Sequence, residues 1–369
     1  MQPKHINCLD GIRAIAFLIV FVSHAGLQER IPGAFGVMIF FFLSGYLITS
    51  LLRLEWENSR RISRKNFYIR RACRILPPLY LVLGFATLLN AMGIPSHNVS
   101  LSGLLSVFFY YFNYLTLTSI SHAALPSGMS VLWSLMVEEH SYLCFPLLYM
   151  FILRRGLSSS AQSRVLLSIC GAALIWRYIL VYVFHTNLTS APQWTFLATD
   201  ARFDSILWGC VLAISANPWC GDVSPSLEEH KGKLAIGGLL LLLFCLLFRE
   251  AHFRETLRYT LQGIGLLPTF YYLIASPISL ASNALAWQSL RWLGWISYTM
   301  YLVHLFGHFV FWKYIPFHNV FVPLLTFVVC GVFSEGIRRF VEKPFRKLAH
   351  RKEPAEPVSQ HLVRVVLSS

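Results

Sequence analysis

The chain has 369 residues, of which 56% are hydrophobic and only 13% are charged, and its mean hydropathy is +0.56. This composition excludes an ordinary soluble domain, a disordered chain and a small disulfide-stapled scaffold. The formal net charge of +14 is concentrated between apolar runs, which favours a role in membrane topology over a nucleic-acid-binding surface.

Eleven apolar runs follow one another along the chain. A membrane-crossing helix needs about 20 apolar residues, and fewer where neighbouring helices cover its polar groups. No internal repeat and no insert of soluble-domain size separates the runs, so we expect an all-α, polytopic integral membrane protein. The runs are Ile12–Leu27, Phe35–Leu52, Ile75–Met92, Leu101–Ile120, Val131–Leu153, Val165–Phe184, Phe203–Ala216, Leu234–Phe248, Tyr259–Pro277, Trp292–Trp312 and Val320–Phe333.

Basic connections orient these runs, because Lys and Arg accumulate in cytoplasmic loops. Three connections are therefore expected in the cytoplasm. They are Arg53–Arg74, Arg338–Lys352 and the loop that carries Arg154, Arg155 and Arg164.

With these three connections inside, the stretch that holds Leu101–Ile120 and Val131–Leu153 can cross only once. We expect Leu101–Ile120 to be the re-entrant or interfacial segment, although the opposite assignment stays open. About ten transmembrane helices result, with both termini cytoplasmic. One loop conflicts with the rule, because Arg249, Arg254 and Arg258 would then lie outside.

Ionisable residues inside an apolar run are costly and become candidates for function, unless they pair within the bundle. Arg13 and His24, in the first run, are eleven residues apart. In a helix this spacing puts both on one face, about 16 Å apart along the axis. A buried neutral imidazole would be a competent general base. The alternative is that His24 only bonds a neighbouring helix while Arg13 extends to the inner interface.

Three arginines, Arg70, Arg71 and Arg74, open the third run. Arg71 and Arg74 share a helical face at the cytoplasmic boundary, where their forked donors suit phosphate. Ordinary anchoring at the membrane surface is the competing interpretation.

Two carboxylates, Glu138 and Glu139, lie in the middle of the fifth run. Glu138 could orient an imidazole or pair with an arginine, and a structural ion pair inside the bundle is the alternative. Other residues are candidates for lining a pocket, although each by itself is more often a satisfied core residue. These are Asp10, Ser44, Trp133, Glu139, Tyr142, Arg202, Asp204, Tyr298 and His304.

The ordered set of these motifs resembles the membrane-bound acyltransferase family 3, the O-acyltransferases that include bacterial O-antigen acetylases. The resemblance covers nearly the whole chain. It is carried by Leu9-Asp10-Gly11-Ile12-Arg13-Ala14, Phe42-Leu43-Ser44-Gly45-Tyr46, Arg71-Ala72-Cys73-Arg74-Ile75-Leu76-Pro77, Trp133-Ser134-Leu135 with Glu138-Glu139, Ser297-Tyr298 with Tyr301-Leu302-Val303-His304, and Val341-Glu342-Lys343-Pro344-Phe345. The chain departs from the usual Gln-Phe-Tyr after the paired glutamates, because His140-Ser141-Tyr142 stands there.

The resemblance implies a ten-span fold and the transfer of an acyl group, usually acetyl, from cytosolic acyl-CoA to a hydroxyl of a sugar or another acceptor. It also implies that His24 is the catalytic histidine. We expect one acyltransferase domain over residues 1–348 and a disordered cytoplasmic tail over residues 349–369. The chain would be a stand-alone form, without the SGNH-type hydrolase domain that some members carry.

The expected mechanism divides the work among five residues. Arg71 and Arg74 would bind the CoA phosphates, and His24 would deprotonate the acceptor hydroxyl. Glu138 would hold the tautomer of His24, and Arg13 would bind the donor or stabilise negative charge. An acyl-histidine intermediate is the competing version.

The expected partners are acyl-CoA as a co-substrate, a cell-envelope carbohydrate or lipid-linked sugar, and the lipid bilayer. No cofactor, metal or nucleic acid is expected. Localisation would be the bacterial inner membrane, with lipopolysaccharide among the candidate acceptors. A polytopic transporter or flippase of a glycan is the alternative function, and a channel or scaffold would not need the ordered Arg/His/Glu set. The acceptor, the acyl length and the oligomeric state are not readable from the sequence.

Overall fold

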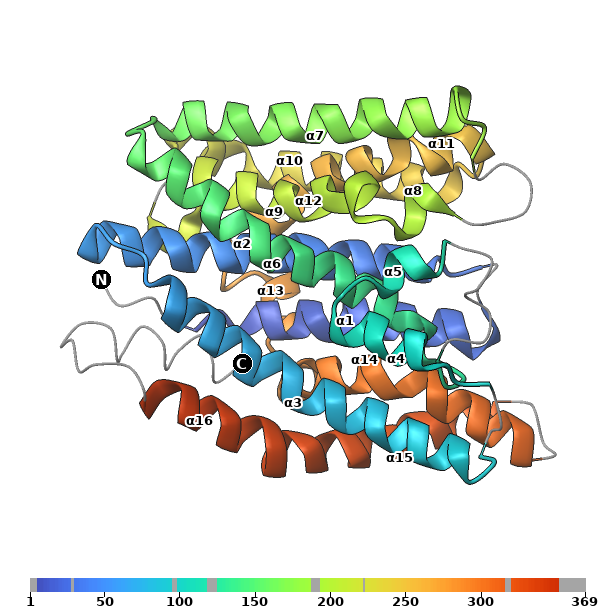
Figure 1. Cartoon of the computed structure of the whole chain (residues 1–369). Helices are drawn as coiled ribbons and strands as arrows, with labels where there is room; N and C mark the ends of the chain where they lie inside the picture. Colours follow the sequence, from blue (N-terminus) through green and yellow to red (C-terminus); the bar gives the residue numbers. More distant parts are fainter. Residues whose placement is uncertain are drawn as a thin grey trace.

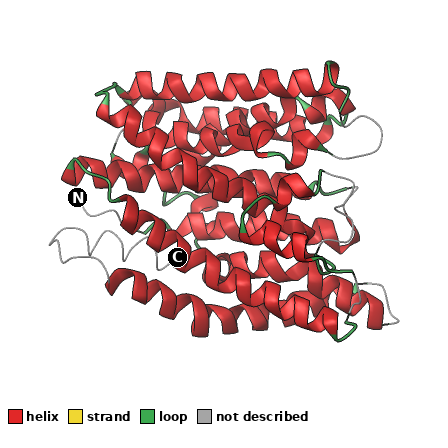
Figure 2. Ribbon diagram, in the orientation of Figure 1, coloured by secondary structure: helices red, strands yellow, loops and turns green. Residues whose placement is uncertain are grey.

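A computed structural model gives the fold of this chain. It describes residues 5–27, 30–94, 98–117, 125–186, 193–221, 223–315 and 320–351. Throughout these ranges the regular structure is helical and no strand is present (Figure 2). Most of the predicted polar tail, residues 352–369, lies outside them.

The helices follow one another in chain order with short connections. They are α1 (Asn7–Val22), which continues as a π-helical turn (Ser23–Leu27), α2 (Gly33–Ser59), α3 (Arg64–Ala91), α4 (Leu101–Phe108), α5 (Phe112–Leu115), α6 (Leu132–Arg154), α7 (Ser159–Tyr182), α8 (Trp194–Leu197), α9 (Thr199–Ser215), α10 (Pro225–Leu247), α11 (Ala251–Glu255), α12 (Leu257–Ala275), α13 (Leu280–Leu285), α14 (Gln288–Tyr314), α15 (Phe321–Ile337) and α16 (Lys343–Arg351), with a second π-helical turn at Arg338–Glu342.

Local sequence sets several of the helix starts. Ser63 accepts a hydrogen bond from the backbone N–H of Asn66 at the start of α3, and Ser158 does the same for Ala161 at the start of α7. Such caps satisfy N–H groups that have no partner inside the helix.

Long helices cover ten of the eleven predicted apolar runs. The exception is Leu101–Ile120, whose described part forms only α4 and α5, of 8 and 4 residues. At about 1.5 Å per residue neither can cross a hydrocarbon core of about 30 Å. By contrast, α6 continues over 23 residues, which agrees with the expectation that Val131–Leu153 is the crossing segment.

Six helical stretches are both long enough and apolar enough to cross a membrane. The remaining long helices, α6, α9, α12 and α14, lie among them in the bundle (Figure 1). Glu138, Asp204 and other polar residues lower the hydropathy of these inner helices. The all-helical polytopic architecture is thus confirmed, whereas the count of ten crossings stays a prediction. The six stretches are Asn7–Leu27, Gly33–Ser59, Arg64–Ala91, Ser159–Tyr182, Pro225–Leu247 and Phe321–Ala349.

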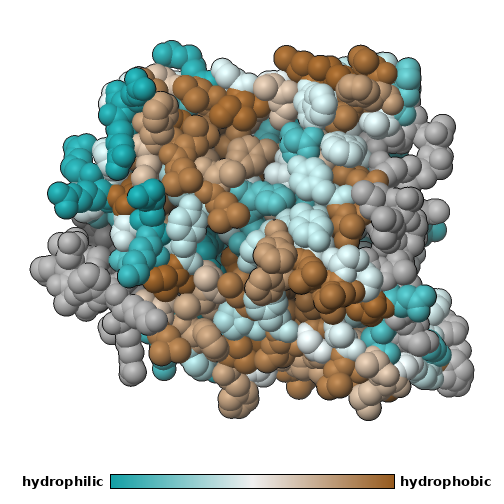
Figure 3. All heavy atoms as spheres, in the orientation of Figure 1, coloured by the Kyte–Doolittle hydropathy of each residue, from teal (hydrophilic) through white to brown (hydrophobic). Residues whose placement is uncertain are grey.

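The basic connections gather at one end of the bundle. The link from α2 to α3, the link from α6 to α7 and helix α16 all lie at the left in Figure 1. This is the arrangement that the charge pattern predicts for a cytoplasmic end. Figure 3 shows hydrophilic residues at this end, and apolar residues around a hydrophilic to neutral patch in the middle of the same face.

Helices α2 and α9 pack closely because each carries a glycine at the contact. A Cβ added to Gly45 would lie 2.0 Å from the carbonyl oxygen of Ile206, and one added to Gly209 would lie 1.9 Å from that of Phe42. Any side chain at either position would therefore push the helices apart. The small-residue break at Ser44-Gly45 thus serves the close approach of another helix.

A buried ion pair joins α7 to α9. Arg177 donates to both carboxylate oxygens of Asp204 at 2.9 and 2.8 Å, and both side chains are 0% exposed. Arg177 also donates to the hydroxyl of Thr260 on α12 and to the carbonyl oxygens of Thr256 and Ala201. All of its donors are thereby used inside the bundle, as a buried charge requires.

Candidate active site

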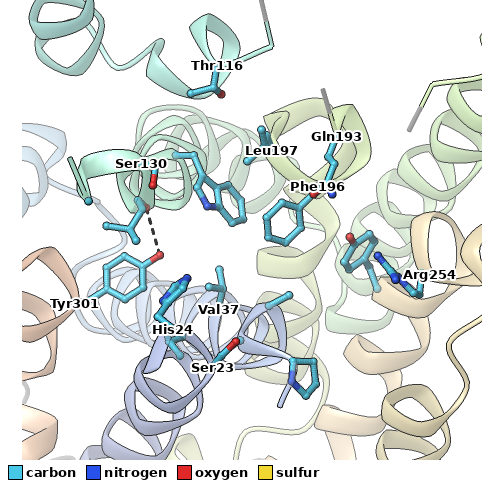
Figure 4. A pocket seen from close by; sticks show the side chains of 18 of the residues that line it. Ser23, His24, Val37, Thr116, Ser130, Gln193, Phe196, Leu197, Arg254 and Tyr301 are labelled. Carbon is cyan, nitrogen blue, oxygen red and sulfur yellow. Dashed lines mark hydrogen bonds between the residues drawn. The ribbon is translucent and has the colours of Figure 1, made fainter. Parts of the chain in front are cut away.

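A cavity of about 1210 Å³ is lined by segments that lie at the end of the bundle opposite the basic connections (Figure 1). We call it the outer cavity. Its lining comes from the end of α1, the start of α2, residues 125–133, α8, and the segment from the end of α10 to the start of α12. In Figure 4 His24 and Tyr301 lie on one side of it, Phe196 lies across from them and Arg254 lies farther along.

His24 reaches this cavity because α1 changes its winding there. Residues Ser23–Leu27 form a π-helical turn in which Gly26 has φ +98°, a left-handed conformation that glycine adopts without strain. His24 is half-buried and lines the cavity.

The partner of His24 is His304 of α14. The Nδ1 atom of His24 lies 3.0 Å from the Nε2 atom of His304, and the Nδ1 atom of His304 lies 2.8 Å from the carbonyl oxygen of Tyr301. Because a carbonyl oxygen only accepts, Nδ1 of His304 carries the proton, and Nε2 of neutral His304 is an acceptor. His24 therefore donates from Nδ1, which leaves its Nε2 atom unprotonated.

Glu138 has other partners than the histidine expected for it. Its carboxylate accepts hydrogen bonds from the hydroxyls of Ser44 and Tyr142, the latter at 2.5 Å. The structure therefore does not bring Glu138 and His24 together, and His304 occupies the position predicted for the glutamate. Sequence spacing could not show this, because Glu138 and His304 belong to different helices.

A second, smaller cavity of about 100 Å³ lies nearer the basic end, and we call it the inner cavity. Four arginines line it together with Ser44, Glu138, Tyr142 and Tyr298. Three of them, Arg13, Arg71 and Arg74, were predicted from the sequence, and the fourth is Arg346 of α16. The Arg71 guanidinium lies 4.8 Å from the ring centre of Tyr142.

Asp10 does not line the inner cavity, but it contacts residues that do. Its buried carboxylate lies 3.6 Å from Arg13, 3.7 Å from Arg291 and 2.8 Å from His5, and accepts a hydrogen bond from Trp295 at 3.1 Å. Arg13 and Trp295 line the cavity. Asp10 therefore positions residues of the site.

Val37 and Tyr301 line both cavities and therefore stand between the two spaces. The hydroxyl of Tyr301 lies 2.7 Å from that of Ser134 and also donates to the carbonyl oxygen of Val131 at 3.2 Å. Tyr298, also expected in a pocket, lines the inner cavity and donates to the carbonyl oxygen of Ile75 at 3.0 Å.

Five of the expected pocket residues line neither cavity: Asp10, Glu139, Arg202, Asp204 and His304. Asp204 is bound to Arg177, which makes it a structural residue, as the competing interpretation held. Arg202 is 0% exposed and lies against the ring of Tyr259, with 3.9 Å between its guanidinium carbon and the ring centre. Its three nitrogens have no hydrogen-bond partner in the described part of the chain. Since Tyr259 lines the outer cavity, Arg202 lies directly behind that wall.

The remaining candidates divide between wall and core. Trp133 lines the outer cavity and packs on Phe196, with ring centres 4.5 Å apart. Glu139 is buried outside both cavities. His140, where the family pattern differs, shares a 2.7 Å hydrogen bond with Thr199 of α9. The departure thus has a structural partner of its own.

Signals in the sequence for Tyr301, Arg346 and Arg177 are weak. Tyr301 stood in a motif without a role, and Arg346 was counted with the basic anchors of the chain end. Arg177 lies in an apolar run, which is itself the signal that could have marked it. Among the described residues no group of three or more His, Cys, Asp or Glu could hold a metal ion.

Comparison with known proteins identifies the family. The family model described as an acyltransferase domain, of the acyltransferase 3 type, matches residues 6–334. The chain is similar to the peptidoglycan O-acetyltransferase OatA of Listeria monocytogenes, with 30% identity over 93% of this chain and 56% of the relative. It is also similar to the putative peptidoglycan O-acetyltransferase YrhL of Bacillus subtilis, with 30% identity over 94% of this chain and 56% of that protein.

A putative O-acetyltransferase of Staphylococcus aureus is 29% identical over 94% of this chain and 58% of its own length. The chain therefore spans somewhat more than half the length of the curated relatives it matches. No solved structure matches it. From the match over residues 6–334 and the helical bundle that carries it, the chain belongs to the membrane-bound acyltransferase family 3.

Proposed function

We propose that the chain is an integral-membrane O-acetyltransferase that moves an acetyl group from cytosolic acyl-CoA to a hydroxyl of a cell-wall carbohydrate. The observation that carries the proposal is the hydrogen-bond chain from His24 through His304 to the Tyr301 carbonyl. It leaves a histidine nitrogen ready to accept a proton beside a cavity of about 1210 Å³, large enough for a sugar. The names of the relatives favour peptidoglycan over lipopolysaccharide as the acceptor.

In this mechanism Nε2 of His24 takes the proton of the acceptor hydroxyl as its oxygen attacks the thioester carbonyl carbon. A new C–O bond forms, the C–S bond breaks, and the departing CoA sulfur takes the proton from His24. His304 accepts from Nδ1 of His24 throughout, and so stabilises the imidazolium and fixes its orientation. Direct transfer needs no covalent enzyme intermediate, which distinguishes it from the acyl-histidine version.

The donor would bind at the inner cavity, where Arg13, Arg71, Arg74 and Arg346 converge. Arginine forks suit the phosphates of CoA, and the pantetheine arm would pass Tyr301 to bring the thioester to His24. The inner cavity has a volume of only about 100 Å³, whereas ligand pockets usually have about 300–1,000 Å³. Donor binding must therefore widen the passage.

The proposal also sets orientation. The basic end of the bundle faces the cytosol with both termini, and the outer cavity faces the other side of a bacterial plasma membrane. Donor and acceptor would thus approach from opposite sides and meet at Tyr301.

The test is transfer of radiolabelled acetyl from acetyl-CoA to purified peptidoglycan fragments by the protein in lipid nanodiscs. His24→Ala should lower the rate at least about 100-fold, the lower range for loss of general-base catalysis. The matched control is His230→Ala, because His230 is exposed on α10 and lies outside both cavities. Retained activity in His24→Ala would refute the assignment. A transporter would leave acetyl-CoA intact.

The donor site has its own test. Replacing both Arg71 and Arg74 with Ala should raise the KM for acetyl-CoA about 10- to 100-fold, since a hydrogen bond between charged groups contributes about 1.5–3 kcal/mol. The control is Arg70→Ala, because Arg70 pairs with Glu55 and does not line the inner cavity. An unchanged KM in the double variant would reduce these arginines to membrane anchors.

A further inference from the structure

We propose that the outer cavity selects an acceptor that carries an oxyanion, a carboxylate or a phosphate, which binds to Arg249, Arg254 and Arg258. The inference rests on the proposed function in that it names the chemistry of the acceptor. It adds a binding site at the far side of the cavity from His24.

All three arginines line the same cavity as His24. They come from the segment that joins α10 to α12, which includes α11. Figure 4 shows Arg254 well away from His24, with Phe196 between them. A sugar could therefore present a hydroxyl to His24 while its charged group lies at the arginines.

The carboxylates near this rim neutralise only part of its positive charge. Glu255 is the one carboxylate in the described lining, and it already accepts a hydrogen bond from Thr195 at 2.5 Å. Arg254 forms an ion pair with it, with 3.7 Å between the charged atoms. Three arginines thus face the cavity against a single carboxylate.

Glu250 is engaged elsewhere. It caps α11 by accepting from the backbone N–H groups of Phe253 and His252. These bonds, with a further one to the His252 side chain, lower the pKa of Glu250 to about 2. The carboxylate therefore stays charged at working pH as a helix cap, and it orders the segment that carries Arg254.

A buried arginine, Arg202, adds to the positive field of Arg258. The Nε atom of Arg258 is buried and has no hydrogen-bond partner among the residues described. Its guanidinium lies 5.2 Å from the ring centre of Tyr259, while Arg202 lies 3.9 Å from the same centre. Neither Arg202 nor Arg258 pairs with a carboxylate in this part of the structure, so both favour an anion in the cavity.

The charge pattern of the whole chain agrees. In the proposed orientation Arg249, Arg254 and Arg258 lie on the outer side, where topology signals do not require arginine. Binding of an anion in the outer cavity would explain why these arginines stand on that side. The CoA phosphates are not this anion, because the arginines of the inner cavity lie toward the other end of the bundle.

The experiment measures binding in the absence of any acetyl donor, with the full chain in nanodiscs. The first probe is a peptidoglycan disaccharide with its free lactyl carboxylate, compared with the same disaccharide as the uncharged amide. The second probe is the disaccharide on a polyprenyl pyrophosphate, compared with the same lipid-linked sugar on an uncharged polyprenyl ether. Wild-type protein should bind at least one anionic probe about tenfold more tightly than its neutral partner, and the pair that shows the difference identifies the source of the anion.

Replacing Arg249, Arg254 and Arg258 together with Gln should reduce binding of the anionic probe to that of the neutral one. Replacement with Lys should keep part of the preference. The matched control is Lys313→Gln, an exposed basic residue at the same end of the bundle that does not line the cavity. Arg254 is exposed, so Arg254→Gln alone should fold normally and lower the preference for the anionic probe in part. This single variant tests the site if the triple variant fails to fold.

Equal binding of charged and neutral probes by wild-type protein would overturn the inference, and so would an undiminished preference in the folded Gln variants. Preferential binding without any acetyl transfer would refute the proposed function and leave the anion site standing. Acetyl transfer without a preference for the anionic probe would support the proposed function and refute the anion site.

Discussion

The contact between His24 and His304 predicts a specific pair of substitutions. His304→Leu fills the buried site with an apolar side chain and removes the acceptor for Nδ1 of His24. His304→Gln keeps an acceptor oxygen close to the position of the lost Nε2 atom. If His304 fixes the tautomer of His24, the two variants must behave differently, although both lose the bond to the Tyr301 carbonyl.

The magnitude follows from the environment of His24. A donor left without a partner costs about 1–3 kcal/mol when it is fully buried. His24 is only half-buried and lines a cavity that water can enter, so the lower part of that range applies. A loss of about 1–2 kcal/mol corresponds to a fall of about 5- to 30-fold in kcat.

The assay measures kcat and the KM for acetyl-CoA with each variant in nanodiscs, after its melting temperature confirms that it is folded. His304→Leu should lower kcat by this factor without raising the KM for acetyl-CoA, and His304→Gln should recover most of the loss. If the Gln variant were as slow as the Leu variant at equal stability, His304 would have a packing role only. If the Leu variant kept full activity, the tautomer argument would fail.

Two further predictions concern the bundle. Gly209→Ala should destabilise the protein by about 1–3 kcal/mol through overpacking, because its Cβ would meet the backbone of Phe42. The control Gly237→Ala, whose Cβ meets nothing within 4 Å, should not lower the melting temperature. Equal melting temperatures of the two variants would contradict the close helix contact. Arg177→Leu should lower the free energy of unfolding by about 3–5 kcal/mol, because it leaves the buried charge of Asp204 without its partner. Adding Asp204→Leu should recover much of this stability. A double variant that melts at a lower temperature than Arg177→Leu would contradict the pairing.

Apolar runs and basic loops predicted most of the fold. Ten runs form long helices. Loop charges allow only one crossing for Leu101–Ile120 and Val131–Leu153 together, and the described part of Leu101–Ile120, the run expected to be re-entrant or interfacial, forms only short helices. Run length and loop charge are properties of the chain alone. The packing order of helices depends on contacts such as Gly45 on α9, which periodicity does not reveal.

The sequence predicted which residues line the site better than it predicted which of them contact one another. Arg71 and Arg74 do line one cavity with Arg13, and His24 lines another. The partner of His24 was not foreseen, because a helical face indicates which side chains point inward but not which helix stands opposite. The π-helical turn at Ser23–Leu27 likewise depends on three-dimensional context.

The small volume of the inner cavity has a consequence for the membrane itself. An enzyme that carries out chemistry between two compartments must not let protons or salts cross. The inner cavity beside Tyr301, of about 100 Å³, is much smaller than the outer cavity of about 1210 Å³, so it is the narrow part of any path between the two ends of the bundle. With the donor arm inserted, the same passage would be filled by the substrate. The narrow point between the two cavities would thus preserve the electrical resistance of the bilayer in both stages of the cycle.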